Sequence, residues 1–118
     1  MGEYDRDNVF ARILRNEVPS DRLYEDDEFI AFRDIAPKAP VHILVIPRHE
    51  GATGPAALED ADAGWMGRMV VVATTIARAE GLDERGYRLV MNNGPDAHQE
   101  VQHIHLHILG GKSLDSMA

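Results

Sequence analysis

Apolar and polar residues in the first third of the chain predict a short helix followed by a hairpin. Asp7 can cap a helix that carries an apolar stripe at helical spacing, and this helix has to end before Pro19. The runs 22–25 and 29–32 are strand-like and are joined by the acidic residues 26–28. Two such runs around a polar connection are typical of a β-hairpin.

The middle of the chain predicts a buried strand and a long helix. Residues 41–46 form an apolar run that contains His42 and is stopped by Pro47. After a glycine-containing loop, residues 60–80 can form the long helix, which has a broad apolar side and is closed by Gly81.

The last third of the chain predicts two more strands. Residues 87–91 restore a strand pattern, and residues 92–96 are rich in turn-forming Asn, Gly and Pro. The run 101–109 alternates histidine with Ile and Leu until Gly110 and Gly111 stop it. Its β-branched residues favour a strand over a helix.

This order of elements predicts the α+β class. We expect a mainly antiparallel, five-stranded sheet with one long and one short helix, and we expect the helices to cover one side of it. The 118 residues fit a single domain, 1–118. Its core would span about residues 7–111, and residues 112–118 would form a short, flexible tail with little to bury.

Composition and charge narrow the classes of partner. The chain has no cysteine, which excludes disulfides and thiolate metal sites and suits a reducing cytoplasm. Its net charge of -8 argues against a general nucleic-acid binder. No apolar stretch approaches the roughly 20 residues of a membrane span. We therefore expect a cytoplasmic protein without a membrane or nucleic-acid partner.

Three histidines in the last apolar run carry most of the functional information. In a strand, His103, His105 and His107 would share one face, and the intervening apolar residues would occupy the other. Neighbouring imidazoles disfavour each other's protonation, so one ring can stay neutral and nucleophilic while another donates a proton. Attack on phosphorus would also need donors for the phosphate oxygens, and the loop 92–100 could supply them.

The spacing alone leaves several interpretations open. Alternate strand positions also supply paired imidazole ligands for zinc, so metal binding and catalysis are equally good interpretations of the three histidines, and incidental placement is the third. Taken alone, His42 is more often a hydrogen-bonded structural residue than a catalyst. His49 and His98 lie in predicted loops, where a solvated role is the default.

Residues 103–109, His-Ile-His-Leu-His-Ile-Leu, match the signature of the histidine triad family of nucleotide hydrolases and transferases, in which histidine alternates with apolar residues. Residues 32–47 resemble the central segment of that family, at a similar distance from the triad. The resemblance covers about residues 7–111. Because Gly110 and Gly111 follow the triad, the chain is similar to the Hint branch rather than to the Fhit branch, which usually has Pro-Arg there.

The resemblance implies a homodimer whose sheet continues between subunits, with Trp65 and Met69 of the long helix in the contact. It implies that His105 attacks the α-phosphorus of a nucleoside monophosphate conjugate and forms a nucleotidyl intermediate that water releases. His107 would lie near the α-phosphate and the leaving group. The rings of His103 and His42 would orient His105.

The resemblance also implies a nucleotide site. Phe10, Ile13, Val18 and Phe32 would surround the base, and Asp34 would accept from the ribose hydroxyls. The phosphate oxygens would be held by Asn92, Gln99 and the backbone amides near Glu100 and Val101. Ile35 and His107 complete the expected nucleotide site. Without the resemblance, the apolar members would be read as core residues and Asp34 as a turn cap. Two positions depart from the family pattern, since many relatives carry Ser or Thr at Glu100 and Gly at His98.

The activity implied is hydrolysis of purine nucleoside 5'-phosphoramidates, such as an adenosine phosphoramidate, to a monophosphate and an amine, with no metal or other cofactor. A dinucleoside polyphosphate hydrolase is the alternative within the family. A non-catalytic nucleotide-binding interaction protein and a metalloprotein are alternatives of other classes.

Overall fold

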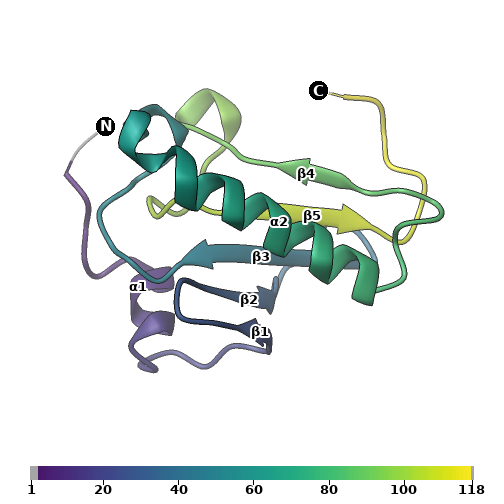
Figure 1. Ribbon diagram of the computed structural model, residues 1–118, viewed down its shortest axis with the longest axis horizontal. Helices are drawn as coiled ribbons and strands as arrows, with labels where there is room; N and C mark the ends of the chain where they lie inside the picture. Colours follow the sequence, from purple (N-terminus) through teal and green to yellow (C-terminus); the bar gives the residue numbers. More distant parts are fainter. Residues whose placement is uncertain (1–2, 118) are drawn as a thin grey trace.

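The computed structural model describes residues 3–117 and contains one five-stranded antiparallel sheet with two α-helices (Figure 1). The strand order is β1-β2-β3-β5-β4. The predicted α+β class, the five strands and the long and short helices are confirmed. The elements are α1 (Val9–Leu14), β1 (Arg22–Glu25), β2 (Phe29–Arg33), β3 (Val41–Pro47), α2 (Ala63–Ala79), β4 (Arg88–Val90) and β5 (Leu106–Gly110), with 3-10 turns at Pro55–Ala57, Asp60–Asp62 and Pro95–Ala97.

The two helices cover opposite faces of the sheet, so the prediction that they share one side is wrong. The longer helix, α2, crosses one face over β3 and β5 (Figure 1). Its buried residues belong to a cluster formed by Phe29, Ala31, Ile43, Val45, Met69, Ala73, Ile76, Ala77, Leu82, Leu106 and Ile108. The shorter helix, α1, packs on the other face. There its residues and those of β2 and β3 form a second cluster, which consists of Phe10, Ile13, Ile30, Phe32, Leu44 and Ile46. Because β2 and β3 are covered on both sides, their sequences are almost continuously apolar.

Three predicted boundaries move by a few residues. Asn8, not Asp7, is the N-cap of α1, because the Asn8 side chain accepts a hydrogen bond from the amide of Ala11 at 2.9 Å. The long helix begins with a 3-10 turn and becomes α-helical only at Ala63. Pro47 is the last residue of β3 and pairs with the first residue of β2.

The strand that carries the histidines is shorter than predicted. Only residues 106–110 pair with β3, so His107 lies in the strand while His103 and His105 precede it. The amide of Ile104 donates instead to the carbonyl of Ala52, at 2.9 Å, which takes this stretch of backbone out of the sheet ladder. Within β5 the expected alternation holds, because Leu106 and Ile108 pack in the cluster beneath α2.

Two further features bear on the expected partners. Met69 is wholly buried against the sheet, so the expectation that it forms part of a dimer contact is wrong. The indole Nε1 of Trp65 donates to Asp62 at 2.8 Å. Among residues 3–117, no helix is long and apolar enough to cross a membrane.

Candidate active site

A small hollow on the α1 face brings two of the three histidines together. It has a volume of about 60 Å³ and is lined by Phe10, Asp34, Leu44, Asn92, His98, Glu100, Val101, His105 and His107. The register of the sheet explains why Leu44 and His107 line this hollow together, because Leu44 of β3 pairs with His107 of β5 and both side chains therefore share a face. His105 precedes His107 by two residues in the chain. Two larger hollows, of about 310 and 250 Å³, share several of these lining residues.

His105 is held by a main-chain carbonyl. Its Nδ1 lies 2.7 Å from the carbonyl oxygen of His103, and the ring is buried against Phe10 in an edge-to-face contact with centroids 4.9 Å apart. A carbonyl can only accept, so Nδ1 carries the proton of the neutral ring. The lone pair of neutral His105 is therefore on Nε2.

His107 has the opposite arrangement of protons. The amide of Lys38 donates to Nδ1 of His42 at 3.0 Å, so neutral His42 carries its proton on Nε2. That Nε2 lies 2.8 Å from Nδ1 of His107, which must then accept. Neutral His107 thus carries its proton on Nε2, a buried atom that has no hydrogen-bond partner among residues 3–117. A buried polar atom left unpaired is costly and needs an explanation.

These contacts change the expected roles of two histidines. His42 orients His107 rather than His105, and the Asp34 carboxylate lies 3.4 Å from the same His42 Nε2. The His103 ring does not line the hollow, because its two nitrogens contact Tyr4 and the Pro47 carbonyl. It is the main chain of His103, not its ring, that holds His105. The contact with Tyr4 was not expected from the sequence.

Burial lowers the pKa of the three triad histidines and of His42. Loss of solvent is the largest cause, and it lowers the pKa of His103 and of His107 to about 4. It also lowers the pKa of His42 and of His105 from the ordinary value of 6.5, although the negative charge of Asp34 partly opposes this. All four rings are therefore neutral at pH 7.

The largest of the three adjoining hollows is mainly apolar. Its volume of about 310 Å³ is in the range of small-molecule sites, and its apolar lining includes Phe10, Ile13, Val18, Phe32, Ile35, Leu44 and Val101. Phe10, Ile13 and Phe32 are also buried in the core beneath α1. These residues can therefore be core residues and also line a pocket for the base. Ile35 stands at the rim with 97% of its surface exposed.

The polar residues expected around phosphate and ribose fall into two groups. Asp34, Asn92 and Glu100 line the histidine hollow. Gln99 does not, because its amide accepts from the backbone of Gly94 at 2.8 Å and donates to the carbonyls of Thr53 at 2.7 Å and Val101 at 3.0 Å. The side chain of Gln99 is therefore occupied in bracing the loop, contrary to the expectation that it holds phosphate.

Asp34 combines both of the roles considered for it. One carboxylate oxygen accepts from the amide of Ala36 at 2.8 Å, as a turn cap does, while the other lies beside His42. Asp34 lines all three hollows.

A metal ion is compatible with the residue types present but competes with the hydrogen bonds. Asp34, His42 and His107 each offer an atom, and these atoms lie within 4.8 Å of one another. However, a proton of His42 and a lone pair of His107 are already joined at 2.8 Å. An ion bound by both nitrogens would have to break that contact.

Comparison with known families identifies the type of protein. A family model described as "HIT domain" matches residues 15–114, which is most of the chain. The chain belongs to the HIT, or histidine triad, family. The matched residues include the histidine run 103–107.

Relatives of this HIT protein match along nearly its whole length. It is 46% identical to the "14 kDa zinc-binding protein" of Brassica juncea (92% of this chain, 96% of the relative) and 48% identical to the "Purine nucleoside phosphoramidase" of Escherichia coli strain K12 (94% and 92%). It is 43% identical to the "Adenylylsulfatase HINT1" of Arabidopsis thaliana (94% and 76%), which agrees with the Hint branch. A histidine triad protein from Clostridium difficile has a similar structure, with a TM-score of 0.90, 38% identity and coverage of 97% and 98%.

Proposed function

We propose that this HIT protein hydrolyses purine nucleoside 5'-phosphoramidates to a nucleoside 5'-monophosphate and an amine. The observation that carries the proposal is the pairing of His105, which offers a lone pair on Nε2, with His107, which offers a proton on Nε2, in one hollow beside an apolar cavity. The E. coli relative that is named a purine nucleoside phosphoramidase supports the choice of substrate.

The reaction would proceed in two displacements. Nε2 of His105 attacks the α-phosphorus, and the phosphorus–nitrogen bond breaks. The bound anionic phosphate raises the pKa of His107, so that His107 in its imidazolium form gives its Nε2 proton to the departing nitrogen and becomes neutral. The nucleotidyl-His105 ring is then an imidazolium that keeps its Nδ1 proton and donates it in a hydrogen bond to the carbonyl of His103. Water attacks this intermediate, returns a proton to His107 and releases the monophosphate.

The remaining contacts of the nucleotide are assigned from the hollows. Phe10, Phe32 and their apolar neighbours would enclose the base, and the Asp34 carboxylate would accept from the ribose hydroxyls. Asn92 and the backbone amides near Glu100 and Val101 would donate to phosphate oxygens. An apolar cavity of this kind binds a purine face without strong discrimination between bases.

His105→Ala tests the mechanism directly. With an adenosine phosphoramidate as substrate, the variant is expected to lose at least about a thousandfold in kcat, because the nucleophile is removed. His49→Ala is the matched control, since the His49 ring is exposed and packs edge-to-face on Trp65 outside the hollow.

The outcomes separate the competing functions. Rapid-quench mass spectrometry should detect a nucleotidyl group on His105 of the wild type. Equal turnover by wild type and His105→Ala would remove the mechanism, and tight monophosphate binding without turnover would indicate a binding protein. A higher catalytic efficiency on a dinucleoside polyphosphate would replace the proposed substrate class.

Zinc binding is a second candidate function. The ligand atoms of Asp34, His42 and His107 could converge on an ion, and the Brassica relative is named a zinc-binding protein. Elemental analysis and an activity assay in a chelator decide between the two. Stoichiometric zinc together with loss of activity in the chelator would favour the metal function.

We also propose that the protein is a homodimer that associates through the outer surface of α2. Val70 and Val71 are the exposed large apolar residues of that helix, at 40% and 63%. An exposed apolar patch of this kind is typical of an interaction surface.

A further inference from the structure

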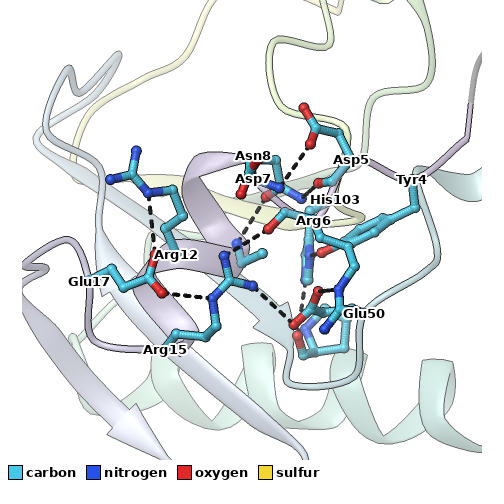
Figure 2. A network of polar contacts seen from close by, with 12 residues as sticks. Tyr4, Asp5, Arg6, Asp7, Asn8, Arg12, Arg15, Glu17, Glu50 and His103 are labelled. Atoms are coloured by element: carbon cyan, nitrogen blue, oxygen red, sulfur yellow. Dashed lines mark hydrogen bonds and ion pairs between the residues drawn. The ribbon is translucent and has the colours of Figure 1, made fainter.

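Tyr4 contacts the active-site region from the far end of the chain. Its hydroxyl lies 2.5 Å from Nδ1 of His103, and the two rings have centroids 5.6 Å apart (Figure 2). His103 is 99 positions away in the sequence and only 1% exposed. In the proposed mechanism the His103 carbonyl holds the nucleophile, but Tyr4 has no role.

The direction of this hydrogen bond is fixed by the other nitrogen of His103. Nε2 lies 3.0 Å from the carbonyl oxygen of Pro47, which can only accept, so Nε2 carries the proton. In the neutral ring, Nδ1 is then an acceptor and the Tyr4 hydroxyl donates to it. Both nitrogens are thus satisfied, and the ring is held between the N-terminal segment and the end of β3.

The His103 ring and the carbonyl that holds His105 belong to the same residue. The His103 carbonyl oxygen accepts from Nδ1 of His105 at 2.7 Å, and the next amide, of Ile104, is bound to Ala52. The contacts of the His103 ring are therefore the route by which the N-terminal segment can influence the carbonyl that aims His105. No other contact described for the nucleophile fixes which of its nitrogens carries the proton.

The segment that carries Tyr4 is itself anchored to the rest of the protein. Arg15 donates to the carbonyl of Arg6 at 2.8 Å, and the side chains of Arg6 and Arg15 each lie 3.5 Å from the Glu50 carboxylate (Figure 2). The amide of Asp7 also donates to the side chain of Asp5 at 2.8 Å. The Tyr4 hydroxyl is thus presented to His103 by a segment with contacts of its own.

We propose that Tyr4 is a positioning residue for the nucleophile, which acts by holding the His103 ring so that the His103 carbonyl keeps Nε2 of His105 directed at the substrate. This proposal rests on the proposed hydrolase function. Tyr4 itself does not line any of the three hollows of the site.

Tyr4→Phe tests the proposal, because it removes only the hydroxyl. Loss of one hydrogen bond that aims the nucleophile is expected to lower kcat about three- to tenfold, with KM for the phosphoramidate unchanged. Tyr24→Phe is the matched control, since the Tyr24 hydroxyl donates to Asp26 at 2.6 Å in the hairpin, away from the hollows. The control is expected to keep the kcat of the wild type.

Imidazole nitrogen NMR supplies a readout that general loss of stability would not move. In Tyr4→Phe, the Nδ1 resonance of His103 should shift to that of a free acceptor nitrogen, and the Nδ1 proton of His105 should exchange faster with solvent. Both signals should be unchanged in Tyr24→Phe.

Two results would overturn the proposal. One is an unchanged His105 signal together with an unchanged kcat in Tyr4→Phe, and the other is an equal loss of kcat in both Phe variants. If the wild type does not hydrolyse the phosphoramidate, the proposed function fails, while the exchange of the His105 proton still decides whether Tyr4 positions this ring.

Discussion

The rings of His105 and His107 differ because their Nδ1 atoms meet different partners. Nδ1 of His105 donates to a main-chain carbonyl, whereas Nδ1 of His107 accepts from His42. Nε2 of His105 therefore offers a lone pair, and Nε2 of His107 carries a proton. Attack can start from the neutral His105 ring, while His107 directs an N–H at the phosphate and the leaving group.

Activity is expected to persist below pH 6.5. His105 must be neutral to attack, and burial lowers its pKa from 6.5, so the ring is protonated only as the pH falls through this lower value. The acid limb of the kcat/KM profile should consequently lie below pH 6.5. A profile recorded on wild type checks this, with His49→Ala as the control that leaves the limb in place. A limb at or above pH 6.5 would contradict the prediction.

At this scale the sequence could predict which residues carry the chemistry but not their protonation. The histidine alternation and the segment around Asp34 indicated residues that the structure brings to one hollow. The proton positions depend on contacts such as that between the Lys38 amide and His42, and no local pattern indicates them. The contact between Tyr4 and His103 spans 99 positions and leaves no periodic signal.

At the scale of elements, the sheet was predictable and the placement of the helices was not. The run 41–46 is apolar throughout because both faces of β3 are covered, so it indicates burial without saying which helix lies on which face. The predicted histidine strand was too long for a related reason. Its apolar residues remain buried after the chain has left the sheet, as Ile104 is 1% exposed outside β5.

The loop before β5 contains a residue in an unfavourable conformation. His98 has φ 58°, the left-handed region that favours glycine, and it also lines the histidine hollow. His98→Gly should therefore raise the free energy of unfolding by about 1 kcal/mol, because the cost of a Cβ in this region is removed. His98→Ala keeps the Cβ and should give no such gain. Urea unfolding measures both variants, and equal stabilities would show that the backbone of this loop is not strained.

At the scale of the whole molecule, the surface of α2 is the feature that a single chain leaves uncovered. A hollow of about 540 Å³ lies along this helix and is lined by the small and apolar residues Phe29, Gly64, Gly67, Val71 and Val72 together with the charged Asp26, Glu28 and Arg68. The site histidines lie on the other face of the sheet. Association through α2 would therefore leave the nucleotide site of each subunit accessible.

Val71→Asp is expected to produce a monomer. A carboxylate at a position that is 63% exposed in one chain but covered in a dimer would be buried without a partner. Light scattering should give the wild type twice the mass of one chain and the variant the mass of one. Ser113→Asp adds the same charge on an exposed tail residue and should leave the dimer intact. A monomeric wild type would refute the association.

The partner of His105 is a peptide group, which carries no full charge and does not titrate. A carboxylate in that place would make the imidazole more basic and would hold it more firmly as a cation. The His103 carbonyl also raises the pKa of His105, but the lowering by burial outweighs it, so the ring stays weakly basic. A weakly basic amine departs readily from phosphorus, so a nucleotidyl group on His105 would pass rapidly to water.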